Sequence, residues 1–250
     1  MGVRPGDDFG RRPDGRRAAE AIAEGVRGVP PGEVPERLCV IAVRLLPVTG
    51  ASASLRGGDG LPVRLCASGG RASYLAEIQA TLGDGPCVRA AATGAPVLAP
   101  DLRPGADADR WPVFAQQATA VGVYAVHALP LGSGTVCVGT LDLYRDTPGG
   151  LTEPELDTAR LVAGAMTVSL MALPRGREYD ERGGPDSWPD GPADGHDEVH
   201  QGVGMIMAQL GVGADEALAR LRASAFARGR TAHAVARDLL ARRERFDRDR

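Results

Sequence analysis

The stretch of sequence that decides the C-terminal fold reads EVHQGVGMIMAQLGVGADEALARLRASAFAR, residues 198–228. Small and apolar residues recur in it at helical spacing, and the glycines at 211 and 213 interrupt the pattern. The spacing predicts a first helix over about 197–210 and a second that begins near Ala214, with Gly213 as its N-cap. A third helix is expected after Thr231, a good N-cap residue. Three short helices together predict a small bundle.

The first predicted helix carries an apolar stripe formed by Val199, Val203, Ile206 and Leu210. Two glycines, Gly202 and Gly204, interrupt it, and each weakens a helix by about 1 kcal/mol relative to alanine. Only close packing against another backbone makes such a glycine useful. The third helix repeats the apolar pattern with Val235, Ala236, Leu239 and Phe246.

The second predicted helix has two faces that differ in character. At about 100° per residue the inward side carries Ala217, Leu218, Leu221 and Ala225. The outward side carries Ala219, Arg220, Arg222, Ala223, Phe226 and Ala227. Unpaired RNA bases stack on aromatic rings and phosphates pair with arginine, so this smooth face suits a nucleic-acid loop. A second interpretation stays open, in which Phe226 caps the core of the bundle.

The region before residue 174 shows strand pairs between helices. Apolar runs at 51–55 and 62–67 are separated by Gly57-Gly58-Asp59-Gly60, which is a hairpin signal, and a second pair is expected at 123–131 and 135–144. Helices are predicted over 36–46, 73–83, 112–121 and 153–173, with a short helix and a strand within 84–98. Thr152 is the expected N-cap of the long helix. This order of elements predicts an α+β domain.

The linking and terminal segments differ in composition. Residues 174–196 contain four prolines and several glycines, which predicts a linker, and Trp188 inside it is expected either to dock or to lie in solvent. Residues 1–17 are rich in charge, Gly, Pro and Arg, which predicts disorder. The domains are therefore expected at 18–173 and 197–250.

The C-terminal stretch resembles the ANTAR family of small helical RNA-binding domains in transcription antiterminators. The resemblance rests on His200-Gln201, Gly204–Val212, Ala214–Leu218 and Leu221–Phe226. It implies that the domain binds a hairpin RNA in nascent transcripts, prevents termination and acts as a homodimer. The candidate RNA-binding residues are Arg220, Arg222, Phe226, Arg228, Arg230, Arg237 and Arg242.

The first domain resembles a GAF domain of the kind found with ANTAR domains, over roughly residues 18–172. The matching segments are Gly83–Cys87, Thr93–Val97, Trp111–Ala115 and Gly139–Arg145. The resemblance implies a central antiparallel sheet with helices on one side and a ligand pocket on the other, acting as a signal-responsive sensor. Candidate residues for a small-molecule ligand pocket are Cys87, Trp111, Phe114, Tyr124 and His127. Cys87 is either a redox-active thiol or a small buried hydrophobe, and His127 either contacts a ligand or points to solvent.

Composition limits the other classes of function. The net charge of −3 predicts no attraction of the whole protein to polyanions, although residues 196–250 carry ten arginines against eight acidic residues. The four cysteines form no CxxC pair, so no metal site is expected, and no cofactor is expected either. The N-terminus has no apolar signal-peptide core, so we expect a cytoplasmic protein. The resemblance to ANTAR domains implies a regulator rather than an enzyme.

Two alternatives remain at the level of sequence. Some GAF-like domains reduce methionine sulfoxide with pocket cysteines, which requires two cysteines to converge and one to have a low pKa. The three C-terminal helices also allow a helix-turn-helix regulator that binds DNA. Comparing the binding of RNA with that of duplex DNA separates this alternative from the RNA-binding hypothesis.

Overall fold

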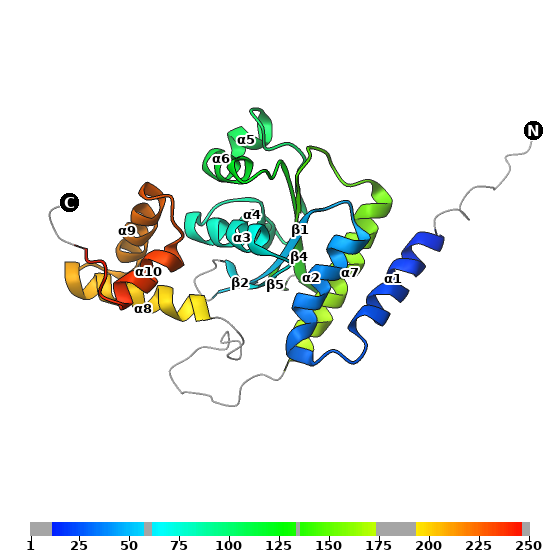
Figure 1. Cartoon of the computed structure of the whole chain (residues 1–250), viewed down its shortest axis with the longest axis horizontal. Helices are drawn as coiled ribbons and strands as arrows, with labels where there is room; N and C mark the ends of the chain where they lie inside the picture. The colour runs from blue at the N-terminus through cyan, green and yellow to red at the C-terminus, as the bar shows by residue number, and fades with distance from the viewer. Residues whose placement is uncertain (1–11, 58–61, 134–135, 174–193, 247–250) are drawn as a thin grey trace, which may run out of the picture.

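A computed structural model describes residues 12–57, 62–133, 136–173 and 194–246 of the chain. Its first part is an α+β unit that ends with α7 (Glu153–Ala172). Its second part is a unit of three helices, α8 (Asp194–Leu210), α9 (Ala214–Ala227) and α10 (Ala232–Leu240). Figure 1 shows the two units side by side, with α9 and α10 next to α3 (Gly70–Leu82). The predicted fold class, an α+β domain followed by a helical bundle, is confirmed.

The sheet of the first unit has five antiparallel strands in the order β2-β1-β5-β4-β3. Their bounds are β1 (Gly50–Arg56), β2 (Pro62–Ala67), β3 (Val97–Ala99), β4 (Ala125–Ser133) and β5 (Val136–Arg145). Both predicted hairpins are present, β1 with β2 and β4 with β5. In the central pair, Ser52 lies opposite Asp142 and Ser54 opposite Thr140, so these four side chains share one face of the sheet.

Helices cover both faces of this sheet. One face packs on α2 (Val34–Leu45) and α7, through a core that includes Leu129, Leu141 and Leu143, and α1 (Arg12–Val26) packs on these two helices. The other face packs on α3, α4 (Pro86–Thr93) and α6 (Pro112–Ala120), through Val126, Ala128 and Tyr144. The elements α5 (Ala106–Arg110) and a 3₁₀ turn, η1 (Pro31–Glu33), complete the unit. Figure 1 shows α1, α2 and α7 on one side and α3 to α6 on the other. Neither face of the sheet is therefore open, although the resemblance implies helices on one side only and a ligand pocket on the other.

The ends of the helices follow the expected local chemistry. Thr152 and Glu155 form a capping box at the start of α7, and Gly83 ends α3 in the left-handed conformation with φ of 65°. Thr231 Oγ1 accepts a hydrogen bond from the Ala234 amide at 3.1 Å and caps α10. Gly213 is the N-cap of α9, as the sequence predicts.

The C-terminal helices enclose a core of their own. Six of the inward residues predicted for the first and third helices are buried in it: Val203, Ile206, Leu210, Val235, Ala236 and Leu239. The other two, Val199 and Phe246, are partly buried against this core, and Phe246 lies after the end of α10 rather than within it. A Cβ built at Gly202 meets Ala236 Cβ at 2.9 Å, whereas one built at Gly204 meets nothing within 4 Å. Gly202 therefore lets α8 approach α10 closely, and Gly204 faces open space.

Two expectations about the segments need correction. The stretch 1–17 was expected to be disordered, but α1 begins at Arg12, and Ala18 and Ile22 on its inner side are buried. The first C-terminal helix begins at Asp194, inside the predicted linker. The rest of the linker from 174 to 193, with Trp188, lies outside the described residues. Within the part of the chain described, no helix combines the length and apolarity needed to cross a bilayer.

Candidate functional site

The outward face of α9 is exposed as its helical spacing predicts. Ala219, Ala223 and Ala227 are exposed, and the Phe226 ring keeps 49% of its surface accessible. The inward positions Ala217, Leu221 and Ala225 are buried, and Leu218 is half-buried against the same core. Phe226 therefore lies at the surface rather than in the core of the bundle, which removes the interpretation of this ring as a core cap.

The candidate arginines fall into two groups by their partners. Arg228 pairs with Glu244, and Arg230 pairs with Asp238 at 2.5 Å and with Glu244 at 3.6 Å. Arg230 also donates to the Ala234 carbonyl at 2.9 Å, so these two side chains tie the end of α9 to α10 and the segment after it. Structural ion pairs thus engage Arg228 and Arg230 within their own domain.

The remaining arginines lie on α9, on α10 and directly after α10. Arg220 forms an ion pair with Glu216 one turn earlier at 2.8 Å, an arrangement in solvent that contributes little energy. Arg222 is half-buried beside it. Arg237 and Arg242 are exposed at the end of α10, where Arg242 adopts φ of 55°. Phe226 and these four arginines are the residues that remain as candidates for the contact face.

A buried polar cluster lies between the sheet and α3 in the first unit. Gln79 Nε2 donates to Asp142 Oδ2 at 3.3 Å, and Gln79 Oε1 accepts from the Cys87 amide at 2.8 Å. The hydroxyls of Ser52 and Tyr144 share a hydrogen bond of 2.9 Å, and the Tyr144 hydroxyl lies 3.5 Å from Asp142 Oδ2. These side chains are all buried. The cluster is therefore a polar site inside an otherwise apolar core.

The cluster is incompletely satisfied. Within the described residues, Asp142 Oδ1, Ser54 Oγ and Thr140 Oγ1 are buried side-chain atoms without a hydrogen bond of good geometry, although the Thr140 hydroxyl is close enough to Asp142 to act on its pKa. Burial raises the pKa of Asp142 to about 7, against the opposing effects of Thr140 and Gln79. Buried oxygens without hydrogen bonds destabilise the folded state, and a group that donates hydrogen bonds to them would remove this destabilisation.

Gly85 makes room for Gln79 in this cluster. Its φ of 133° is one that only glycine adopts readily, and a Cβ there meets Gln79 Oε1 at 2.7 Å. The turn expected at Asp84–Cys87 thus holds Gln79 from one side, while the sheet holds it from the other. The sequence reasoning missed Gln79 and Asp142. The alternation in Thr140-Leu141-Asp142-Leu143-Tyr144, with a polar residue at every second position, is the signal that points to them.

The predicted ligand-pocket residues are not all brought together. Cys87, Trp111 and Phe114 are buried on the same side of the sheet as Asp142, and Tyr124 is half-buried. His127 stands between Val126 and Ala128 in strand β4, so its side chain lies on the other face of the sheet. Its partner on the neighbouring strand is Leu143. His127 is fully buried, which contradicts the expectation of a solvent-facing side chain. Burial lowers its pKa to about 4, so it is a neutral residue of the other core.

The three buried cysteines lie in two separate cores. The Cys39 and Cys66 sulfurs lie 3.6 Å apart, but in the core under α2 and α7, on the opposite face from Cys87. Hydrogen bonding to Cys66 and burial raise the pKa of Cys39 well above its usual value, and burial raises the pKa of Cys87 in the same way. A raised pKa disfavours the thiolate that a reductase or a redox sensor requires. No group of three metal-ligating side chains occurs among the residues described.

Comparison with known families supports both halves of this description. The model of the GAF domain matches residues 30–171, more than half of the chain, and the model of the ANTAR domain matches residues 193–240. No curated protein matches the chain.

Solved structures show the fold of the first unit. A GAF domain from a phosphoenolpyruvate-protein phosphotransferase of Coxiella burnetii is 14% identical with a TM-score of 0.50, over 63% of this chain and 93% of that one. The GAF region of a putative membrane protein from Geobacter sulfurreducens PCA is 15% identical with a TM-score of 0.47, over 56% and 93%. A free methionine-R-sulfoxide reductase from Neisseria meningitidis is 14% identical with a TM-score of 0.45, over 68% and 95%. The chain belongs to the GAF-domain family and carries an ANTAR domain behind it, which is the architecture of a GAF–ANTAR regulator.

Proposed function

We propose that this regulator binds hairpin RNA in nascent transcripts through its C-terminal helices and so prevents transcription termination in the cytoplasm, with the GAF domain as its sensor. The observation that carries the proposal is the exposed face of α9, where the Phe226 ring lies among alanines and is flanked by arginines. Bases of an RNA loop stack on such a ring, and arginines pair with the phosphates around it. A flat alanine surface allows the loop to approach closely.

Titration of the full chain with a synthetic RNA of two short hairpins, at several salt concentrations, tests this function. We expect Phe226→Ala to weaken binding by about 1–3 kcal/mol because a stacking contact is lost. Arg237→Ala is expected to weaken it and to reduce the salt dependence by about one counterion. Val136→Ala is the matched control, since Val136 is an exposed apolar residue of the GAF domain.

The expected outcome distinguishes RNA from DNA. Equal affinity for the two-hairpin RNA and for duplex DNA, or unchanged affinity in all the variants of the α9 face, would contradict the proposal. A transcription assay with a terminator downstream of the hairpins then measures read-through in the presence of the protein.

We further propose that the chain acts as a homodimer joined through α7. Among the described residues, three of the seven large exposed hydrophobic side chains, Leu161, Val168 and Met171, lie on this one helix. Their spacing of seven and three residues places them on one stripe, and a Cβ built at Gly164 between them meets nothing within 4 Å. A stripe of this kind suits a second copy of the same helix.

The input to the sensor is proposed to be a small molecule that donates hydrogen bonds to the polar cluster around Asp142. Asp142 Oδ1, Ser54 Oγ and Thr140 Oγ1 are acceptors that such a molecule would satisfy. Mass spectrometry of small molecules that copurify with the wild-type chain and with Asp142→Asn checks this. Identical spectra from both chains would remove Asp142 from the proposed site.

A further inference from the structure

The C-terminal helices contact the GAF domain through one of its helices, α3. The Ala232 amide, at the start of α10, donates to Thr81 Oγ1 at 2.9 Å. Thr81 and Ala232 are both buried. Both α9 and α10 pack against α3. The two domains thus meet at a defined surface.

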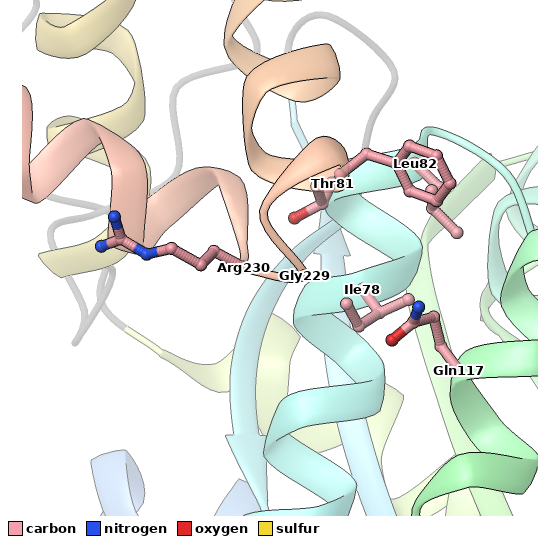
Figure 2. Close-up of a pocket in the computed structure, with 7 residues that line it drawn as sticks. Ile78, Thr81, Leu82, Gln117, Gly229 and Arg230 are labelled. Carbon is pink, nitrogen blue, oxygen red and sulfur yellow. The ribbon is translucent and has the colours of Figure 1, made fainter.

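This contact includes part of the candidate RNA-binding face. Ile78, Thr81 and Leu82 of α3 line a cleft together with Gln117 of α6. The opposite wall is Phe226, Gly229 and Arg230. Figure 2 shows Gly229 and Arg230 on the turn that faces the labelled α3 side chains. A ring that lines this cleft is accessible only in part, so a base has less of it on which to stack.

We propose that this docking on α3 is a closed state, in which the GAF domain masks the RNA-binding face of its own C-terminal domain. The inference rests on the proposed function, in which the Phe226 ring stacks on an RNA base. Docking on α3 obstructs that stacking. In the open state, α9 and the turn at 228–231 leave α3 and both faces of the ring become available. RNA and α3 then compete for one surface, so each disfavours binding of the other.

The position of α3 links this contact to the interior of the sensor. Gln79, two residues before Thr81, holds the buried carboxyl of Asp142 and the Cys87 amide on the inner side of the helix. Thr81 holds Ala232 on its outer side. A ligand that displaces Gln79 from Asp142 moves the same helical turn that carries Thr81. The docking surface is therefore placed where a change in the polar cluster reaches it directly.

Amide hydrogen exchange and RNA binding by the full chain test the closed state. Thr81→Arg places a long charged side chain in the contact, and Thr81→Val keeps the volume but removes the acceptor for the Ala232 amide. Ser73→Arg is the matched control, since Ser73 is a half-exposed hydroxyl residue of the same helix outside the cleft. It adds the same charge as Thr81→Arg, so it separates opening from a gain of positive charge.

We expect Thr81→Arg to increase exchange at residues 229–232 and to raise the affinity for the two-hairpin RNA on the order of tenfold. Thr81→Val is expected to raise the exchange rate and the RNA affinity by smaller amounts. Ser73→Arg is expected to change neither the exchange rate nor the RNA affinity. Unchanged exchange in both Thr81 variants would show that the domains do not dock. Increased exchange with unchanged affinity would show that docking does not mask the RNA-binding face. If no chain binds RNA, the proposed function and the masking both fall, while exchange still reports whether the domains dock.

Discussion

The two glycines of α8 have opposite surroundings at the scale of single residues. Gly202 is buried against Ala236, and Gly204 is exposed. The sequence shows that a helical glycine is useful only against another backbone, but it does not show which of two nearby glycines has that neighbour. The structure assigns this role to Gly202.

Opposite changes in stability are expected from the same substitution at these two sites. Gly204→Ala should stabilise the chain by about 0.5–1 kcal/mol, because alanine is the better helix former and the added methyl meets nothing. Gly202→Ala should destabilise it by about 1–3 kcal/mol, because the methyl overlaps Ala236. Urea unfolding followed by circular dichroism measures both. Equal shifts of the same sign would show that α8 and α10 are not in close contact.

Asp142 gives the stability of the GAF domain a specific pH dependence. Burial raises its pKa from 3.8 to about 7, so the folded state prefers the protonated acid. Its contribution is complete below about pH 4 and is lost as the pH rises through 7. His127, with a pKa lowered to about 4, acts in the opposite sense, and its contribution is lost as the pH falls from 6.5.

The Asp142→Asn variant isolates the effect of the carboxyl. Because Asn does not ionise, its free energy of unfolding relative to wild type should rise between pH 4 and 8, by as much as about 4 kcal/mol. Urea titrations of both chains across this range provide the difference, in which the effect of His127 cancels. Parallel stability profiles would mean that the Asp142 carboxyl ionises as readily in the folded state as in the unfolded one.

At the scale of elements, strong local signals predict the structure well. Both hairpins, the long helix with its Thr152 cap and the three C-terminal helices follow from turn residues, caps and apolar spacing. Helix α1 was not predicted at all, because the glycine, proline and arginines at its start indicate disorder, although Ala18 and Ile22 have helical spacing. Ala18 and Ile22 are buried because α1 packs on α2 and α7, and the sequence of α1 alone does not reveal this packing.

The candidate sites were predicted less completely than the elements that carry them. The outward face of α9 follows from helical periodicity within one segment. The polar cluster joins α3, β1 and β5, and a single sequence does not show which strands are neighbours. For the same reason His127 was assigned to the pocket, although the sheet places it on the other face.

The exposed stripe on α7 leads to a prediction at this scale. Val168→Glu should dissociate the dimer, because Val168 is 68% exposed in the isolated chain and a charge there would be buried between two copies. Val136→Glu is the control, with the same change at a valine of β5 that is 60% exposed. Sedimentation equilibrium determines the mass of each chain. A wild-type chain that sediments as a monomer would contradict the proposed dimer.

At the scale of the whole molecule, the two competing contacts of the C-terminal domain differ in their chemistry. RNA binding releases counterions, so its affinity should fall linearly with the logarithm of salt concentration. The docked contact involves Thr81, the Ala232 amide and apolar side chains such as Leu82, so it should depend little on salt. Rising salt therefore favours the closed state when RNA is present.

Exchange at Ala232 and RNA affinity, measured over the same range of salt, check this difference. We expect exchange of the free chain to stay constant while affinity falls steeply. If exchange at Ala232 rises in parallel with the loss of affinity, ion pairs must hold the domains together.

The hydrogen bond between Thr81 and Ala232 joins residues that the ribosome makes at different times. Ala232 follows the end of α7 by about 60 residues, which at 5–20 residues per second takes about 3–12 s. The GAF domain is thus made before the segment that docks on α3. In each new chain the α3 surface is therefore made before the segment that covers it.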